Sequence, residues 1–450
     1  MRCSALISRQ NFAIFFAIFT SCLTCVNWAA SENPRTEERF TAAQAREMVL
    51  TRAEGSEQID NELRIWQQKA AGAPTTEAPW QKLGELFIAK ARLSGDPGFY
   101  KLAELSSRVL ESVASDPSEA LLLRGHAWLA MHRFRDAESL ARRLTQDREQ
   151  MRDHALLGDA LIDQGRISEA EVAYQRMVDL KPCLSSYSRV GHLRWIVGDR
   201  EGAIEMFRLA IACGNYRDPE PLAWATTRLA SLELQRGNFD AARTCTRRAQ
   251  ELVNDFPAAL VVEARVLLAE DHVAEAISKL ERAVTSNPLP ETQWLLADAL
   301  RVAGRKSDAA AAEVRLQREG AIHDPRTYSL FLATQGYDAA KALQLAEAEL
   351  DARQDVHSFD ALAWAQSAAG DIASARHNSK RALASGTEDA RLFLHAGLIA
   401  RAAGESDEAA ALFEKAHAIQ ATLFPSERQA LQSALASAKP ISAAPISKQP

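Results

Sequence analysis

The sequence predicts an all-α chain built as a solenoid of helical hairpins, and three observations predict it. An alanine recurs at intervals of 33 or 34 residues, with one interval of 39, a glycine lies five residues ahead of most of these alanines, and prolines follow several of the units. Apolar residues make up 47 % of the chain but aromatic residues only 7 %, so most of the apolar mass is Ala and Leu. That composition favours packed helices over sheets.

The alanines define ten units of one period. They are Ala103, Ala137, Ala170, Ala203, Ala242, Ala276, Ala309, Ala342, Ala375 and Ala409. Five residues ahead of them runs a turn column, in which His132 and Asp271 replace glycine and the glycines are Gly98, Gly165, Gly198, Gly237, Gly304, Gly370 and Gly404. Glycine at such a position ends one helix and permits a tight turn into the next, so each unit is predicted to be a helix, a turn and a helix.

A column of small residues lies seven positions before the turn column. Its members are Gly125, Gly158, Gly191, Ala230, Ala264, Ala297, Ala363 and Gly397. Small side chains let two helices approach closely, so this column predicts the contact between the helices of a hairpin. Prolines stop many units before the next begins, and they are Pro117, Pro182, Pro257, Pro288 and Pro325.

These columns carry a family resemblance. The quoted positions are Gly158, Leu161, Gly165, Ala170, Tyr174 and Pro182 in one unit, Gly397, Ala400, Gly404, Ala409, Phe413 and Ala416 in another, and the opening Trp80-x-x-Leu83-Gly84. In spacing and residue type they resemble the tetratricopeptide repeat over about residues 79 to 420. The resemblance implies a tetratricopeptide-type α-solenoid, a right-handed superhelix of about ten helix-turn-helix repeats.

Three places depart from the repeat pattern. About seven extra residues lie between Gly84 and Ala103, an insertion falls at Cys213 to Pro221, and the unit from Asp324 to Arg353 is degenerate. Irregular units of a solenoid bend it or form lips on its binding face, and they also arise by drift in loops. Both interpretations stay open at this point.

The segments around the array have their own predicted roles. Residues 31–78 are expected to form an N-terminal helical capping segment, with amphipathic helices at Phe40 to Arg52 and Ile59 to Ala71. The array follows over 79–420, and residues 421–438 are expected to form a C-terminal capping helix, because repeat arrays need polar-faced ends. Residues 439–450 lack periodicity and are predicted to be disordered.

Residues 1–30 are interpreted as a secretory signal peptide. Arg2 and Arg9 precede an apolar stretch from Phe12 to Val26, and small residues follow at Ala29 and Ala30. The stretch is interrupted by polar residues and is shorter than the ~20 residues of a spanning helix, so no integral span is expected after cleavage. The chain is therefore expected to be exported to the periplasm or cell envelope, with a lipid anchor at Cys22 as the alternative.

The remaining cysteines and the charge distribution limit the classes of partner that the chain is expected to bind. Cys183, Cys213 and Cys245 leave an odd number of thiols outside the leader, and whether any pair forms a disulfide stays open. The formal net charge is −6 without long blocks of one sign. Neither a nucleic-acid footprint nor a polybasic membrane patch is present.

The array carries no motif of known chemistry. Phosphate loops, zinc-protease motifs, nucleophile elbows and paired-cysteine zinc spacings are absent from its sequence. His126, Asp159 and His192 come from successive repeats, but stacked helices lie about 8 to 10 Å apart, too far for easy convergence on one ion. No catalytic residue, cofactor or metal site is therefore predicted.

The partner-binding candidates come from the resemblance, which implies that the first helix of each repeat lines a concave groove. On those helices, the residues after the small column and one turn later are expected to face the groove. The candidates are His126, Asp159, Asp163, His192, Trp195, Arg265, Trp294, Asp298, Arg301 and Trp364. Aromatic and arginine side chains among them suit the recognition of a protein or peptide.

The favoured hypothesis is a non-catalytic protein-interaction scaffold, similar to exported bacterial repeat proteins, that binds a protein or peptide in its groove. The alternative is a regulatory or accessory subunit of an envelope enzyme or transport complex. A catalytic domain would have to fit into residues 31 to 78 or the short tail, which favours the scaffold. The sequence does not identify the partner.

The mature chain is predicted to begin near Ser31, because the small residues at Ala29 and Ala30 follow directly on the apolar segment. The intact mass of protein purified from its native host measures this. A retained leader, or a diacylglyceryl mass on Cys22, would contradict the expectation.

Overall fold

The computed structural model describes residues 40–55 and 57–438. This part of the chain forms 23 α-helices and one short 3-10 helix, and it contains no β-strand. The predicted leader at 1–30 and the predicted disordered tail at 439–450 lie outside the described residues. Within the described residues, no helix combines the length and apolar character needed to cross a bilayer.

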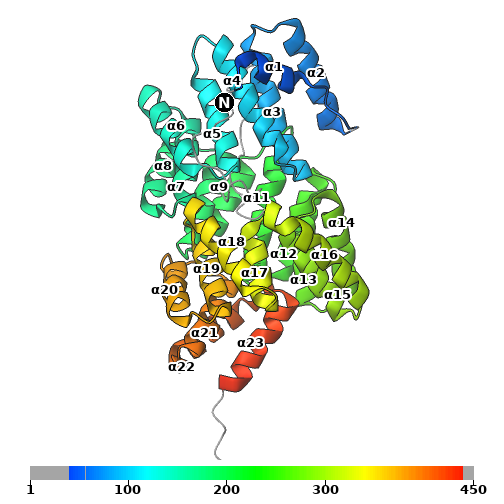
Figure 1. Cartoon of the computed structure of the whole chain (residues 1–450), viewed down its shortest axis with the longest axis vertical. Coiled ribbons are helices and arrows are strands. Elements are labelled where there is room, and N and C mark those ends of the chain that lie inside the picture. Colours follow the sequence, from blue (N-terminus) through cyan, green and yellow to red (C-terminus); the bar gives the residue numbers. More distant parts are fainter. Residues whose placement is uncertain (1–39, 56, 439–450) are drawn as a thin grey trace, which may run out of the picture.

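Ten consecutive helical hairpins make up the array (Figure 1). In chain order they are α3 (Glu77–Ser94) with α4 (Gly98–Val113), α5 (Ser118–Ala130) with α6 (Phe134–Asp147), α7 (Met151–Asp163) with α8 (Ile167–Leu180), α9 (Leu184–Ile196) with α10 (Arg200–Ala212), α11 (Pro219–Gln235) with α12 (Phe239–Leu252), α13 (Pro257–Ala269) with α14 (Val273–Ser286), α15 (Pro290–Val302) with α16 (Lys306–His323), α17 (Pro325–Gln335) with α18 (Ala339–Ala352), α19 (Val356–Ala368) with α20 (Ile372–Leu383), and α21 (Ala390–Ala402) with α22 (Ser406–Ala418).

Short elements flank the array at both ends. At the N-terminal end, α1 (Ala42–Leu50) packs on α4 and α2 (Gln58–Gly72) packs on α3. At the C-terminal end, the 3-10 helix η1 (Gln420–Thr422) leads into α23 (Pro425–Ala438), which packs on α22. Helices therefore lie where the sequence placed its capping segments.

The alanine column forms the spine of the core. All ten of its members are at most 2 % exposed, because each lies where the second helix of a hairpin meets its neighbours. Larger side chains fill the space between these contacts, among them Tyr174, Phe207 and Phe413, which are fully buried. Alternation of small and large residues at crossing points is what close packing of stacked helices requires.

The small-residue column marks the close contacts, as predicted. A Cβ added at Gly158 would clash with the ring of Tyr174 in the same hairpin, and Gly397 faces Phe413 in the same way. At Gly125 the neighbour is Leu156, which belongs to the first helix of the following hairpin. The column therefore serves contacts within hairpins and also between them.

The turn column is confirmed by its backbone conformation. Its glycines from Gly165 onward have positive φ, and so do the two substitutes, His132 at 58° and Asp271 at 62°. In the first unit the left-handed residue is Gly95, at φ 70°, whereas Gly98 begins α4. The extra residues of that unit lengthen α3 and leave a short turn, so no long lip forms there.

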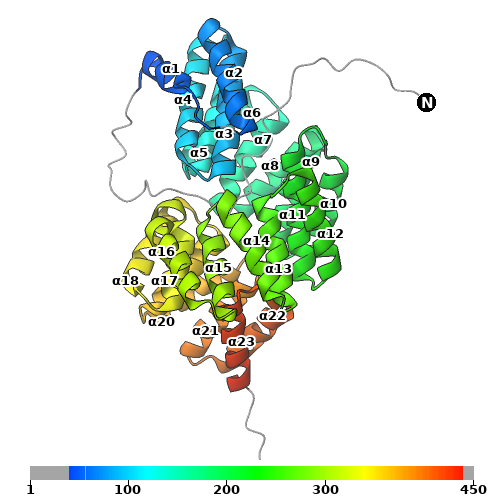
Figure 2. The same cartoon turned by 90° about the vertical axis from the view of Figure 1, so that its right-hand side faces the viewer.

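The array curls far enough for its last hairpins to return to its middle (Figures 1 and 2). Backbone N–H of Gln354 donates to the carbonyl oxygen of Asp163 over 3.0 Å, and Oγ1 of Thr387 donates to the carbonyl oxygen of Ile196 over 2.5 Å. The side chain of Gln235 donates to the carbonyl oxygen of Glu388. We call these contacts the seam; it joins the turns after α7 and α9, and the end of α11, to the loops after α18 and α20.

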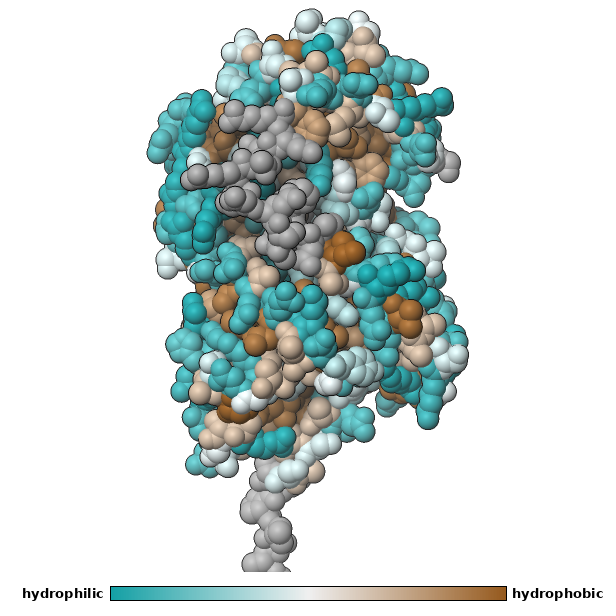
Figure 3. All heavy atoms as spheres, viewed as in Figure 1, coloured by the Kyte–Doolittle hydropathy of each residue, from teal (hydrophilic) through white to brown (hydrophobic). Residues whose placement is uncertain are grey.

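Outside the seam the molecule has an ordinary solvent-facing surface. In the view of Figure 3 it is mostly hydrophilic, with hydrophobic side chains in small separate patches. The most exposed large hydrophobic side chains of the described residues lie apart in the sequence: Val172 on α8, Tyr216 in the loop between α10 and α11, and Val314 on α16. The three described cysteines, Cys183, Cys213 and Cys245, are all free.

Two turn glycines are predicted to hold the seam closed. A Cβ at Gly165 would clash with the carbonyl oxygen of Gln354, and one at Gly198 with that of Gly386. Gly237 and Gly304 share the positive φ but have nothing within 4 Å of such a Cβ. Gly165→Ala and Gly198→Ala should each lower the free energy of unfolding by about 1 kcal/mol or more beyond the loss in Gly237→Ala and Gly304→Ala.

Urea denaturation of the four variants measures this difference, and small-angle scattering should show a larger radius of gyration only for the first two. Equal losses at all four positions would mean that the seam contributes nothing beyond the turn conformation.

Candidate functional site

A cavity of about 660 Å³ runs between the two arms of the curled array. The first helix of each of the ten hairpins contributes lining residues, from Ile88 on α3 to Leu392 on α21. The seam closes part of its wall, since Asp163, Gly165 and Gln354 also line it. We call this space the central cavity; its volume lies within the range of sites that bind ligands or peptide segments.

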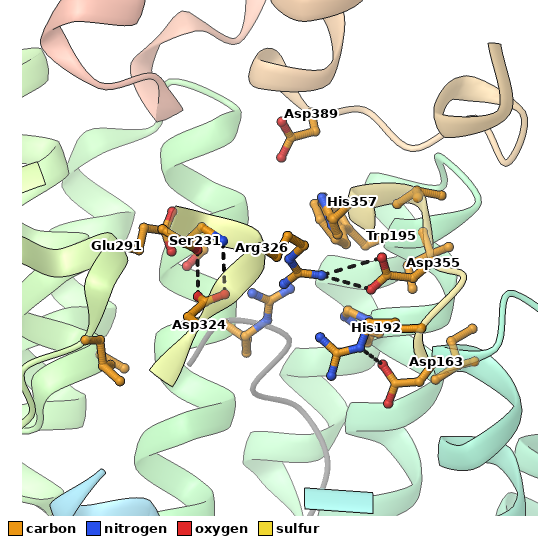
Figure 4. A pocket seen from close by; sticks show the side chains of 18 of the residues that line it. Asp163, His192, Trp195, Ser231, Glu291, Asp324, Arg326, Asp355, His357 and Asp389 are labelled. Carbon is orange, nitrogen blue, oxygen red and sulfur yellow. Dashed lines mark hydrogen bonds and ion pairs between the residues drawn. The ribbon is translucent and has the colours of Figure 1, made fainter. Parts of the chain in front are cut away.

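A charged network crosses the seam at one side of the cavity (Figure 4). Nε of Arg353 lies 3.3 Å from Oδ1 of Asp163, and Arg353 also contacts Nε2 of His132 over 2.8 Å. Nη1 of Arg326 lies 3.2 Å from Oδ2 of Asp355. Both arginines are at most 6 % exposed, so water offsets little of the cost of burying their charges. The paired groups must offset nearly all of that cost.

Burial and neighbouring charges shift the pKa values of these groups in different directions. Burial raises the pKa of Asp163 to about 6, and the Arg353 cation offsets only part of that effect. Burial also acts to raise the pKa of Asp355, but Arg326 and Arg353 outweigh it and hold that pKa below its ordinary value. Burial, and then Arg353, lower the pKa of His132 well below its usual range. At neutral pH the network therefore contains two carboxylates, two guanidinium groups and a neutral imidazole.

An aromatic cluster lies beside this network. The ring of Trp195 stacks on that of His357 at 5.9 Å between centroids and lies 5.7 Å from that of His192. The guanidinium of Arg228 lies over the Trp195 ring at 5.5 Å, and Nε1 of Trp195 donates to Oε1 of Gln235 over 3.2 Å. The indole is thus held by polar contacts at its edge while it lines the cavity.

The far end of the cavity is occupied by the chain itself. Phe424, between η1 and α23, is fully buried and meets the ring of Trp294 edge-on at 5.1 Å. The guanidinium groups of Arg265 and Arg391 lie over the Phe424 ring at 5.3 and 4.6 Å. Arg265 is in turn paired with Glu291 over 2.9 Å.

Four of the ten predicted groove residues line the central cavity. They are Asp163, His192, Trp195 and Arg265. Each lies on the inner side of a first helix, as the resemblance implied. Whether any of them contacts a partner stays a prediction.

Two further candidates are enclosed between hairpins. Asp159 has no exposed surface; Nε and Nη2 of Arg189 donate to its carboxylate over 2.9 and 2.8 Å, and the hydroxyl of Tyr174 donates over 2.7 Å. His126 is 3 % exposed, and burial lowers its pKa well below the usual value. Asp159 thus joins α7, α8 and α9 and is not on an open surface.

The last four candidates make contacts within the fold. Trp294 is fully buried in the core, and Asp298 accepts from the backbone N–H of Ser426 over 3.0 Å. Arg301 is paired with Glu313. The ring of Trp364 stacks on His395 at 4.3 Å. A first helix that packs on its hairpin partner and on the next hairpin leaves only a narrow strip of residues for the cavity.

Sequence reasoning missed the residues that the C-terminal hairpins bring to the cavity. They are Asp324, Arg326, Glu349, Arg353, Asp355, His357 and Arg391. A signal for most of them did exist, because the unit from Asp324 to Arg353 departs from the repeat pattern. Arg353 in this unit has partners, Asp163 and His132, on the opposite arm of the array, and no repeat pattern could reveal that pairing.

Among the described residues, no group of three or more His, Cys, Asp or Glu side chains is placed to hold a metal ion. What the arrangement offers is a set of arginine, carboxylate and aromatic groups in an elongated cavity. Such groups are those that recur at the centres of protein–protein interfaces.

Comparisons with known proteins agree with the repeat architecture. The tetratricopeptide repeat family matches residues 122–182, 227–288, 261–321 and 361–422, while no curated protein sequence matches the chain. Similar solved structures include the APC/C hetero-tetramer Cut9-Hcn1, at 13 % identity and TM-score 0.42 over 88 % of this chain and 67 % of that one.

Two smaller proteins are also similar. PilF of Pseudomonas aeruginosa shares 17 % identity at TM-score 0.39 over 52 % of this chain and 97 % of that one. MamA shares 17 % identity at TM-score 0.30 over 36 % and 93 %. With four regions matched by the family and ten hairpins stacked in one array, the chain belongs to the tetratricopeptide-repeat proteins, a family of protein-interaction scaffolds.

Proposed function

We propose that this protein is a non-catalytic scaffold of the bacterial periplasm or cell envelope that binds an extended segment of a partner protein in its central cavity. The observation that carries the proposal is the composition of the cavity wall. First helices from all ten hairpins contribute to it, and aromatic and arginine side chains such as Trp195, Trp224 and Arg265 are among its residues. Export rests on the leader predicted at 1–30, which lies outside the described residues.

A polypeptide fits this wall better than a strongly charged ligand does. Arginines alternate with carboxylates along the cavity, and pairs such as Arg326 with Asp355 and Arg265 with Glu291 balance each other. A nucleic acid would call for an excess of positive charge, whereas the chain carries a formal net charge of −6. An extended peptide has side chains of both signs and backbone groups that can use such a wall.

Trp195 is expected to be the main anchor for the partner, because it is the aromatic side chain that the cavity presents between His357 and Arg228. Trp195→Ala should reduce capture of the partner from envelope extract at least tenfold, as loss of an interface anchor does. Affinity capture followed by quantitative mass spectrometry measures this loss.

Trp128 offers a matched control. It also lies on a first helix, donates from Nε1 to Glu104 over 3.1 Å and has the guanidinium of Arg133 over its ring at 4.3 Å, but it does not line the cavity. Trp128→Ala should capture the partner as wild type does. If Trp195→Ala and Trp128→Ala capture equal amounts, with similar melting temperatures, the cavity is not the binding site.

A further inference from the structure

The segment from Leu423 to Arg428 is held in the array by residues far from it in the sequence. Phe424 has no exposed surface and contacts Trp294 on α15, Arg265 on α13 and Arg391 on α21. Two of these residues precede it by more than one hundred positions. The contact is therefore a docking site formed by separate hairpins, and it is more than a local cap on the last repeat.

Polar contacts fix the orientation of the docked segment. Oδ2 of Asp298 accepts from the backbone N–H and the hydroxyl of Ser426, over 3.0 and 2.5 Å, at the N-terminus of α23. Nε of Arg391 donates to Oε1 of Glu427 over 2.5 Å. A carboxylate at a helix N-terminus is favoured because unpaired backbone N–H groups point toward it.

Together these contacts indicate which features of a segment this surface recognises. Trp294, Arg265 and Arg391 enclose an aromatic ring, Asp298 receives the start of a helix, and Arg391 also pairs with an acid three residues after the ring. Aromatic and arginine anchors of this kind are the groups that dominate protein–protein affinity. The surface thus contacts an aromatic residue and, three positions on, an acid at the start of a helix.

The segment that occupies the surface leaves part of it unused. Nε1 of Trp294 and Nε of Arg265 are both buried and have no hydrogen-bond partner. Buried donors of this kind are normally satisfied, and leaving them unpaired weakens the bound state. A hydrogen-bond acceptor beside the aromatic ring of a bound segment would satisfy them.

The surface is also accessible from the central cavity. Arg265, Glu291, Arg391 and Thr422 belong at once to the cavity wall and to the neighbourhood of Phe424. A partner segment that lies in the cavity therefore reaches the edge of this surface without crossing the core.

We propose that Arg265, Trp294, Asp298 and Arg391 form a recognition site for a partner segment with an aromatic residue and, three positions on, an acidic residue at the start of a helix. Residues 423–428 are its resident occupant, which such a partner displaces. The proposal rests on the proposed function, because it assigns one end of the same cavity.

The test uses a fluorescent peptide of residues 420–438 and the full-length protein. The peptide should bind the Phe424→Ala protein at least tenfold more tightly than wild type, because the resident anchor is gone and the surface is free. Adding Arg391→Ala to that variant should abolish binding. Arg401 supplies the matched control, since it lies on the same helix over the ring of Phe413 at 5.5 Å and is outside the site.

A second, milder variant tests the proposal even if Phe424→Ala prevents folding. Glu427→Gln removes the charge that pairs with Arg391 but keeps an oxygen that can accept from the backbone N–H of Phe424, as Oε2 of Glu427 does over 2.8 Å. It should therefore bind the peptide severalfold more tightly than wild type while melting cooperatively. A peptide whose Phe424 is replaced by Ala should not bind any of these proteins.

Two results would overturn the proposal: no binding of the peptide to either variant, or equal binding to wild type and variants. Trp195→Ala in the Phe424→Ala background should leave peptide binding unchanged. Because the peptide assay needs no partner from extract, failure of this site and failure of the proposed function can be told apart.

Discussion

The close approach of helices at the alanine column is the constraint on which the rest of this structure depends. Ten alanines at one period allow every second helix to pack against its neighbours, and each larger side chain at that position would push two hairpins apart. The distance between hairpins sets the curvature of the array. Without that curvature, the turns after α7 and α9 would not meet the loops after α18 and α20, and there would be neither a seam nor a central cavity.

The seam makes the binding surface differ from that of an open groove. Groups that come from opposite arms, such as Arg353 and Asp163, are paired across it, and their burial changes the pKa of the acid. Part of the concave face is likewise used by Phe424 and the start of α23. A partner can therefore use only the part of the concave face that these intramolecular contacts leave open. The side chains on that part come from both arms of the array.

The sequence predicted the repeat architecture because repeats depend on local patterns. The alanine period, the turn glycines and the two substitutes His132 and Asp271 all follow from requirements within one or two hairpins. The site was only partly predictable, since Asp163, His192, Trp195 and Arg265 line the cavity while Asp159 and Trp294 are buried. The places of Arg326, Arg353 and Asp355 in the cavity could not be predicted from the repeat pattern. They depend on how far the whole array curls, and so does the pairing of Arg353 with Asp163.

The seam also changes how the chain can fold. In an open solenoid each repeat contacts only its neighbours, so folding spreads along the array from any point and nearly all contacts are local. Here Asp163 and Gln354 meet although they lie 191 residues apart in the sequence, and Asp298 and Ser426 meet although they lie 128 residues apart. Bringing such distant residues together costs loop-closure entropy, and this cost is offset only when the intervening hairpins are already in place. The contacts of the seam are therefore expected to form late in folding, and the hairpins that they join lose the independence that repeats of an open solenoid keep.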